Sequence, residues 1–329
     1  MKVVIIGSSG HYNYAIEGIR EDRDVTIVGV APGSEGEDVS PAYRAACKIG
    51  HVPKVYDDYR IMLDEVKPDI AVVNCFFGHH ARVTMQVLER GIHAFVEKPV
   101  ATTFEDLEQL KEAHSRSGVH LAAMFGIRYS AHFITAWNLV KDGVVGEIRL
   151  MNAQKSYKLG QRSDFYKSRS TYGGTIPWVG SHAIDWLYWF SGQKFESVFA
   201  SHSTRYNLEH GDLEVSALCH FTFSNEVFGS VSIDYLRPKQ APTHDDDRLR
   251  LVGTRGVLEV RNGKVYLIND DIDGIREVPL LPKQNIFIDF LRQIRGEGEC
   301  LVTVHDSFYV TEACLKARQS ADEGKVIRF

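Results

Sequence analysis

The sequence predicts an α/β protein with a doubly wound parallel sheet, followed by an α+β part with a large, mostly antiparallel open sheet. Two observations lead to this prediction. Short apolar runs alternate with helix-like stretches through the first 125 residues, as in parallel sheets with helices on both faces. After residue 126, apolar and polar residues alternate within the runs, as in a sheet with one solvated face. We therefore expect a first domain at residues 1–125 and a second at residues 126–329.

Each predicted strand of the first domain is short and apolar, and most are followed by a stretch with apolar residues at helical spacing. Pro68 and Asp69 break the chain before one strand, and Gly91 closes a helix before another. The expected strands span residues 3–6, 25–30, 70–73, 93–96 and 120–125, and the expected helices span 11–20, 42–49, 59–66, 79–90 and 104–115.

The second domain is expected to open with a helix at 130–141. A polar segment at 159–176 predicts an ordered loop near a site. A strongly apolar helix is expected at 177–190, with Pro177 at its start and Gly192 after its end. Asn262 and Gly263 signal a hairpin turn. The other expected strands span 147–158, 197–203, 214–223, 226–234, 248–253 and 256–260, and the closing helices span 285–295 and 307–321.

Composition narrows the class of protein. The 329 residues are 44% hydrophobic and 25% charged, as in ordinary globular proteins. The net charge of −5 gives no reason to expect a nucleic-acid or anionic membrane partner, and no apolar run is long enough to span a bilayer. Residues 1–7 are expected to form a strand and not a signal peptide. Five scattered cysteines indicate reduced thiols, so we expect a cytoplasmic protein without a metal site.

A glycine-rich turn, Gly7-Ser8-Ser9-Gly10, lies between the first predicted strand and a helix. Free N–H groups at a helix start bind phosphate oxygens, and small residues let the backbone approach them. The dinucleotide spacing G-x-G-x-x-G is incomplete, because Ser9 and Tyr12 stand at its second and third positions. The turn indicates either a pyrophosphate site or a simple connection. Ala31, at the end of the second strand, carries no charge that would choose between NAD and NADP.

Glu97-Lys98-Pro99 directly follows the apolar strand at 93–96. Pro99 cannot donate a ladder hydrogen bond, so the strand ends there. Ligands of open α/β sheets bind at the carboxyl ends of the strands. Lys98 is therefore either a ligand-binding group or a surface lysine paired with Glu97.

The apolar helix of the second domain carries two polar residues, His182 and Asp185. They are three residues apart and can lie on one face of a helix. A histidine oriented by a carboxylate is a common general base, but two buried groups of this kind also form purely structural pairs.

Together these motifs resemble the Gfo/Idh/MocA family, which includes glucose–fructose oxidoreductase and inositol 2-dehydrogenase. The resemblance rests on the glycine-rich turn, on Glu97-Lys98-Pro99, and on Gly173-Gly174 followed by Gly180-x-His182-x-x-Asp185. It covers nearly the whole chain. It implies an N-terminal Rossmann domain, NAD or NADP as cofactor, and hydride transfer from a hydroxyl of a sugar, inositol or related polyol. It also implies a homodimer or homotetramer formed through the open sheet.

The resemblance implies roles for individual residues. Lys98 would be the catalytic lysine and His182 the catalytic histidine. The residues implied at the cofactor are Gly7, Ser8, Ser9, Gly10, His11, Tyr12, Asn74, Cys75, Phe76, His80, Glu97, Lys98 and Arg128. The residues expected at the substrate are Lys98, Tyr157, Tyr172, Trp178, His182 and Asp185, with Lys158, Arg162 or Arg169 available to hold a carboxylate or hydroxyls.

The chain departs from the family pattern at three places. The turn lacks two glycines, Cys75-Phe76-Phe77 replaces a Thr-Pro-Asn run, and Trp178 stands where relatives have an aspartate four residues before the histidine. Two alternatives to a net dehydrogenase follow: an enzyme with tightly held NAD that uses transient oxidation for glycoside cleavage or epimerisation, and a nicotinamide-binding sensor without catalysis. His244-Asp245-Asp246-Asp247 could bind a hard metal ion, but we expect a solvated loop.

Overall fold

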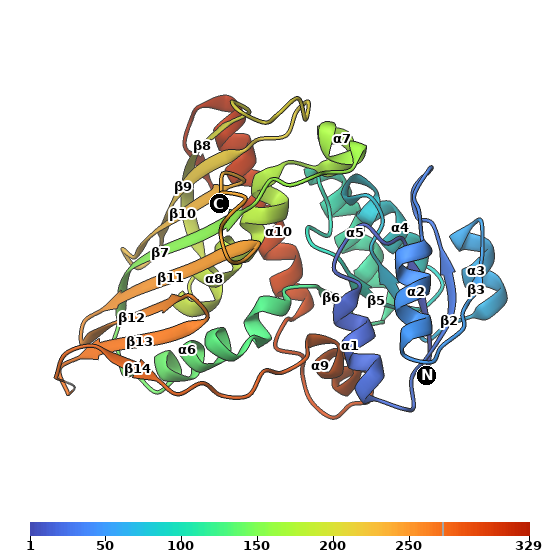
Figure 1. The fold of residues 1–329 in the computed structure, drawn as a ribbon, viewed down its shortest axis with the longest axis horizontal. Coiled ribbons are helices and arrows are strands. Elements are labelled where there is room, and N and C mark those ends of the chain that lie inside the picture. Colours follow the sequence, from blue (N-terminus) through green and yellow to red (C-terminus); the bar gives the residue numbers. More distant parts are fainter. Residues whose placement is uncertain (272) are drawn as a thin grey trace. The chain divides into compact units, whose positions relative to one another are not determined.

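The structure is a computed structural model that describes residues 1–271 and 273–329. It divides the chain into two compact units (Figure 1). Residues that follow the second sheet in sequence return to unit 1. Unit 1 contains Met1–Gly126, Ser170–Gly173 and Asn285–Thr311, and unit 2 contains Ile127–Arg169, Gly174–Gln284 and Glu312–Phe329.

Unit 1 is built on a parallel six-stranded sheet in the order β3-β2-β1-β4-β5-β6, which confirms the predicted doubly wound fold. Every residue of β4 is buried, as expected for a strand covered on both faces. The strands are β1 (Lys2–Ile6), β2 (Thr26–Ala31), β3 (Lys54–Val55), β4 (Ile70–Val73), β5 (His93–Val96) and β6 (Leu121–Ala123).

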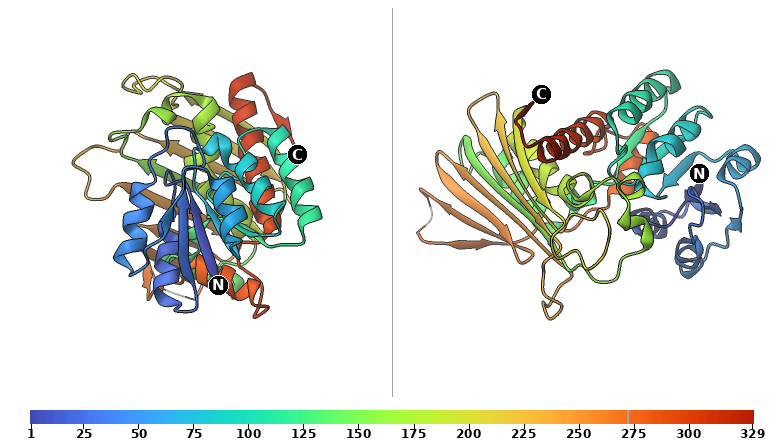
Figure 2. Two further views of the ribbon diagram at one scale, coloured as in Figure 1. Left: turned by 90° about the vertical axis from the view of Figure 1, so that its right-hand side faces the viewer. Right: turned by 90° about the horizontal axis from the view of Figure 1, so that it is seen from above.

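Helices lie on both faces of this sheet (Figure 2). Helix α1 packs with α9, and α4 packs with α5. Phe287 of α9 meets the ring of Phe95 of β5 edge-on at 5.2 Å, and Phe290 stacks on it at 5.5 Å, so the returning segment completes the core of unit 1. The helices are α1 (Asn13–Glu21), α2 (Ser40–Lys48), α3 (Tyr59–Val66), η1 (Phe77–His79), α4 (His80–Leu88), α5 (Phe104–Ser117) and α9 (Ile286–Ile294).

Unit 2 is built on a nine-stranded sheet in the order β14-β13-β12-β11-β7-β10-β9-β8-β15. Only β7 and β10 pair in parallel among these neighbours, which confirms the predicted, mostly antiparallel sheet. The strands are β7 (Ile148–Tyr157), β8 (Phe195–Ser203), β9 (Ser216–Phe223), β10 (Phe228–Asp234), β11 (Asp245–Gly253), β12 (Gly256–Arg261), β13 (Lys264–Asn269), β14 (Arg276–Val278) and β15 (Ile327–Arg328).

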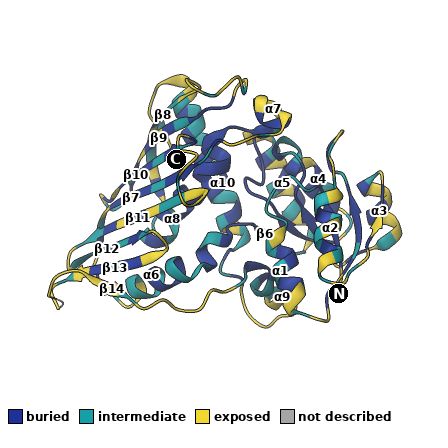
Figure 3. Cartoon of the chain, in the orientation of Figure 1, coloured by how far each residue is buried: buried dark blue, intermediate teal, exposed yellow. Residues whose placement is uncertain are grey.

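Burial alternates along these strands with a period of two (Figure 3). We call the face that packs on α6 and α8 the inner face and the opposite face the outer face. The other elements are η2 (Gly126–Tyr129), α6 (Ala131–Lys141), η3 (Asp164–Lys167), α7 (Arg169–Tyr172), the π-helix η4 (Ile176–Gly180), α8 (Ser181–Ser191) and α10 (Val304–Glu323), whose residues belong to both units. Within residues 1–271 and 273–329, no helix combines the length and hydropathy needed to cross a membrane.

The aspartates after His244 form part of β11, so the expected solvated loop is wrong at this point. Asp246 and Asp247 pair with Ser156 and Lys155 of β7 in the ladder. The Asp247 carboxylate lies 2.6 Å from the ammonium of Lys155, and this ion pair lets an acidic residue enter a strand. The described residues contain no group of three or more His, Cys, Asp and Glu side chains arranged to hold a metal ion.

Candidate functional site

Three neighbouring strands of unit 1 end at one edge of the parallel sheet. Because β1, β4 and β5 are adjacent and parallel, the segments that follow them lie together. The N–H of Ser9 donates to the carbonyl of Asn74 at 2.8 Å, and the N–H of Glu97 donates to Val73 at 2.9 Å. The glycine-rich turn, Asn74 and the Glu97-Lys98 pair therefore form one group, which we call the strand-end site.

At two positions of the turn only glycine fits, because the backbone lies against residues that follow β4 and β5. Gly7 has φ +81°, and a Cβ atom there would lie 2.5 Å from the backbone N and Cα of Cys75. At Gly10 a Cβ atom would lie 2.6 Å from Cγ of Glu97 and 2.8 Å from Oδ1 of Asn74. The degenerate spacing thus keeps glycine where the backbone meets the next two strand ends.

Glu97 is fully buried beneath the turn. It accepts a hydrogen bond from the N–H of His11 at 2.7 Å, and its carboxylate lies 3.0 Å from Nδ1 of that histidine and 3.8 Å from Nζ of Lys98. Burial alone would raise the pKa of Glu97, but the His11 charge and hydrogen bonds together with Lys98 lower it to about 2. Glu97 is therefore a fixed negative charge between two potential cations.

Lys98 is fully buried at the end of β5, so the interpretation as a surface lysine is wrong. It precedes a cis peptide bond to Pro99. His80, which is also buried, lies between two carbonyls: Nδ1 is 2.8 Å from Pro99 O and Nε2 is 3.0 Å from Cys75 O. Burial lowers the pKa of His80, and a neutral imidazole donates only one of these bonds. His80 thus ties the segment after β4 to the turn after Lys98.

Cys75 and Phe76 follow Asn74 at the end of β4. The Cys75 thiol is fully buried, and burial, followed by the nearby Glu37 charge, raises its pKa well above the usual value. The N–H of Phe76 donates to the hydroxyl of Ser34 at 3.1 Å. These contacts fix the backbone after β4, and they give Cys75 no nucleophilic character.

Sequence reasoning missed Glu37, a second acid that contacts the turn. Its carboxylate accepts hydrogen bonds from the N–H of Ser8 and of Gly33, both at 3.1 Å, and from the hydroxyl of Ser9 at 2.5 Å. Burial raises the pKa of Glu37, and these hydrogen bonds oppose that effect. The expected acid position was the end of β2 at Ala31, but here the acid arrives six residues later, through a loop that folds back.

The residues of the strand-end site fit a dinucleotide. The side-chain amide of Asn74 is fully buried, and in the described chain neither its oxygen nor its nitrogen has a hydrogen-bond partner. The N–H groups of Gly10 and Tyr12 also have no acceptor within the described residues, and Tyr12 starts α1 without a side-chain cap. A buried amide is normally satisfied, so the Asn74 side chain marks a place for a polar ligand. The half-buried N–H groups of Gly10 and Tyr12 are available to phosphate oxygens at the start of the helix. Glu37 offers an acceptor for ribose hydroxyls.

Unit 2 holds the second set of predicted residues. His182 and Asp185 are buried in the first turns of α8. Asp185 accepts hydrogen bonds from Arg128, from Nε at 2.9 Å and from Nη2 at 2.5 Å. The guanidinium also lies 5.2 Å from the Trp189 ring. This buried ion pair is a structural partnership of Asp185 that the sequence pattern did not indicate.

The predicted aromatic residues divide between the units. Trp178 and Tyr157 belong to unit 2, with ring centroids 6.3 Å apart. Tyr172 belongs to unit 1, where it contacts Phe77 at 6.1 Å. Trp178 lies within the π-helix Ile176–Gly180, directly before α8. π-turns of this kind frequently occur at functional sites.

Comparisons with known proteins agree with this architecture. A structure from Thermotoga maritima, provisionally described as an oxidoreductase, is 56% identical and superposes with a TM-score of 0.97. The match covers 100% of both chains. Among curated proteins, glycosyl hydrolase family 109 protein 2 of Akkermansia muciniphila is 29% identical over 137 residues, which are 40% of this chain and 28% of that protein.

Inositol 2-dehydrogenase of Salmonella typhimurium is 23% identical over 146 residues, which are 44% of this chain and 42% of that enzyme. The chain therefore spans less than half the length of both curated relatives. The family model for the GFO/IDH/MocA C-terminal domain matches residues 133–259. The model for the oxidoreductase family with an NAD-binding Rossmann fold matches residues 1–125. The chain belongs to the Gfo/Idh/MocA family of NAD-binding oxidoreductases.

Proposed function

We propose that this protein is an NAD-dependent dehydrogenase that oxidises a hydroxyl-bearing carbon of a sugar, inositol or related polyol. The observation that carries the proposal is the buried Lys98, held at the carboxyl end of β5 beside the Glu97 carboxylate and the glycine-rich turn. A buried ammonium at a strand end is suited to stabilising negative charge that develops on a reacting oxygen.

The protein's own groups supply position, charge and a proton acceptor. Lys98 donates a hydrogen bond to the substrate hydroxyl oxygen and stabilises the charge that forms there. His182, in α8, accepts the hydroxyl proton. A bound nicotinamide supplies the acceptor for the hydride. Tyr157, Tyr172 and Trp178 are proposed to contact the substrate, whereas the bond to Arg128 supports a positioning role for Asp185.

Glu37 supports NAD over NADP as the cofactor. Its carboxylate lies on the glycine-rich turn, where it accepts from Ser8, Ser9 and Gly33. A carboxylate in this position accepts hydrogen bonds from ribose hydroxyls and repels a 2′-phosphate.

The test is cofactor reduction, followed by absorbance, with NAD and NADP separately against inositols, aldoses, sugar acids and amino sugars. Lys98→Ala is expected to lower kcat by orders of magnitude and to leave NADH binding, measured by fluorescence, within a few-fold. The same is expected for His182→Ala. Unchanged turnover in Lys98→Ala would remove that residue from the chemistry.

A redox-neutral reaction is the second candidate, and one observation favours it. The chain matches part of a glycosyl hydrolase family 109 protein. Glycoside cleavage through transient oxidation would leave no net NADH. Nicotinamide nucleotide released from purified protein on denaturation, with sugar turnover but no absorbance change, would support this candidate over the first.

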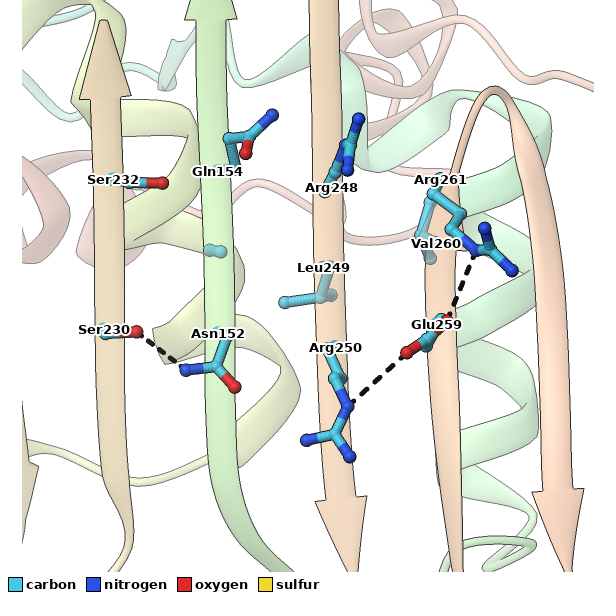
Figure 4. Close-up of a pocket in the computed structure, with 11 residues that line it drawn as sticks. Asn152, Gln154, Ser230, Ser232, Arg248, Leu249, Arg250, Glu259, Val260 and Arg261 are labelled. Carbon is cyan, nitrogen blue, oxygen red and sulfur yellow. Dashed lines mark hydrogen bonds and ion pairs between the residues drawn. The ribbon is translucent and has the colours of Figure 1, made fainter.

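We also propose that the protein forms a homodimer or homotetramer through the outer face of the second sheet. Leu150, Leu218 and Phe228 are exposed by 40%, 59% and 44% on β7, β9 and β10. A shallow pocket of about 270 Å³ on the same face is lined by Arg248, Arg250, Arg261 and Glu259 (Figure 4). Exposed apolar side chains beside charged ones are typical of subunit contacts. Light scattering of the native protein and of Leu218→Glu tests this proposal.

A further inference from the structure

A single guanidinium in unit 2 is enclosed by three aromatic rings. Cζ of Arg162 lies 4.9 Å from the ring centroid of Tyr235, 5.4 Å from that of Tyr166 and 5.9 Å from that of Trp178. All three rings are buried. We call Arg162 and these rings the guanidinium cage. Each ring face attracts the cation, so the cage fixes the position of a side chain that is otherwise long and flexible.

Among the described residues, no acidic side chain forms an ion pair with the guanidinium of Arg162. Nη2 donates to the carbonyl of Lys158 at 3.1 Å, while Nε is buried without a hydrogen-bond partner among the described residues. In the described residues no carboxylate oxygen lies within 4 Å of the Arg162 guanidinium, whereas Arg128 pairs with Asp185 and Arg169 with Glu214. A buried donor left unsatisfied costs about 1–3 kcal/mol, so the cage is set up for an external acceptor.

The charges that act on His244, beside Tyr157 and Arg162, are mainly positive. Besides Arg162, the cations are Lys158 and Lys155, of which Lys155 is matched by Asp247 at 2.6 Å. Burial lowers the pKa of the neighbouring His244, and Arg162 lowers it further, against an opposing effect of Asp245. Because the effect of Arg162 outweighs that of Asp245, the net charge acting on the His244 ring is positive, and this favours a bound anion.

The cage is connected to the predicted catalytic histidine. Trp178 belongs to the π-helix Ile176–Gly180, which leads directly into α8 and His182 four residues later. Tyr157 extends this buried aromatic cluster, with its ring 6.3 Å from Trp178 and 6.1 Å from Tyr235. At Trp178 the family pattern has an acid, so this chain has an aromatic ring beside an arginine where relatives carry negative charge.

We propose that Arg162 binds the carboxylate of a sugar acid, so that the substrates of this protein are carboxylated carbohydrates. The carboxylate accepts hydrogen bonds from the guanidinium. A carboxylate fits better than a phosphate, because one unmatched guanidinium balances one negative charge and a phosphate dianion would leave an excess among buried rings. This inference rests on the proposed dehydrogenase function.

The experiment compares matched ligands and matched variants. Binding of glucuronate, galacturonate, glucose, galactose and glucose 6-phosphate to the NADH-loaded protein is measured by calorimetry, and turnover of the same compounds with NAD is measured by absorbance. Each is repeated with Arg162→Gln, Arg162→Lys and the control Arg149→Gln, which removes an arginine paired with Glu147 on β7. A charge-assisted hydrogen bond contributes about 1.5–3 kcal/mol, or roughly 10- to 150-fold in Kd.

We expect a sugar acid to bind at least tenfold more tightly than its neutral parent sugar. Arg162→Gln should abolish that preference, Arg162→Lys should retain part of it, and Arg149→Gln should retain all of it. Equal binding of acids and neutral sugars, tighter binding of the sugar phosphate, or a preference that persists in Arg162→Gln would each overturn the proposal. If Arg162→Gln does not fold, Arg162→Lys provides the test. An ammonium cannot make the two parallel hydrogen bonds of a guanidinium, so a full preference for sugar acids in Arg162→Lys would overturn the proposal.

The two proposals fail in different ways. If neutral polyols are turned over and this turnover does not depend on Arg162, the proposed dehydrogenase function stands and the proposed carboxylate site is wrong. If sugar acids bind in an Arg162-dependent way but are not turned over, and Lys98→Ala does not change this binding, the carboxylate site stands and the proposed reaction is wrong.

Discussion

The buried pair Arg128–Asp185 makes Asp185→Ala the sharpest test of how unit 2 is held together. Both side chains are almost fully buried, and their closest contact is 2.5 Å. Removing the carboxylate leaves a guanidinium without its opposing charge, so we expect unit 2 to lose about 3–5 kcal/mol of unfolding free energy. That is a large share of the roughly 5–15 kcal/mol of a typical native protein.

The assay is urea unfolding followed by tryptophan fluorescence. All four tryptophans lie in unit 2, so the signal reports that unit. Glu277→Ala is the matched control, because it removes the acid of a pair with Lys264 at 2.8 Å in which both side chains are about half exposed. We expect the control to cost below about 1 kcal/mol. The double variant Arg128→Met/Asp185→Leu should recover most of the loss, since it removes both charges.

A loss in Asp185→Ala no larger than that of the control would refute this reasoning. The double variant also separates stability from chemistry. If it folds with near-native stability and keeps turnover, Asp185 acts only through packing. Normal stability with turnover reduced tenfold or more would support the prediction that Asp185 orients His182.

Three further predictions concern the strand-end site. Gly10→Ala should raise the Kd of NADH at least tenfold, which is about 1.4 kcal/mol, because the added Cβ would displace Glu97 and Asn74. An unchanged Kd in a fluorescence titration would contradict the close approach at Gly10. Glu37→Gln should lower the ratio of kcat/KM with NAD to kcat/KM with NADP by about tenfold or more, because it removes the charge that repels a 2′-phosphate. An unchanged ratio would exclude Glu37 as the group that selects NAD. Glu97→Gln should be less stable than the native protein at pH 7, by up to about 3 kcal/mol, and the gap should close as pH falls. The direction follows because folding lowers the pKa of Glu97 to about 2: its charge stabilises the fold above the unfolded pKa near 4.5, and this stabilisation disappears toward pH 2. The same dependence of unfolding free energy on pH in both proteins would contradict this prediction.

The parallel sheet was predictable because its signals are local. Each strand is a short apolar run with a turn or helix after it, and the burial of β4 follows from its sequence alone. Lys98 at the end of β5 was predictable for the same reason, since Pro99 marks where the strand stops.

What the sequence did not reveal depends on contacts between distant residues. Glu37 reaches the turn through a loop that folds back after β2, and no local pattern indicates that return. Asp185 pairs with Arg128, 57 residues away, although His182 is its neighbour on the helix. Strands β13 and β14 were missed although the hairpin turn between β12 and β13 was recognised. Strand β14 has three residues, two of them charged, whereas the alternation of Val265 and Leu267 in β13 was a signal that could have been used.

The return of residues 285–311 to unit 1 has a consequence for biosynthesis. Phe95 lies in a strand made early, whereas its partners Phe287 and Phe290 are made near the end of translation. At about 5–20 residues per second the first sheet waits roughly 10–40 s on the ribosome with part of its apolar face uncovered. Nascent chains of this protein should therefore need a chaperone for that interval, and a gene cut after residue 126 should yield an aggregation-prone fragment. Appending the segment 285–311 to that fragment should supply the missing helix and reduce its aggregation.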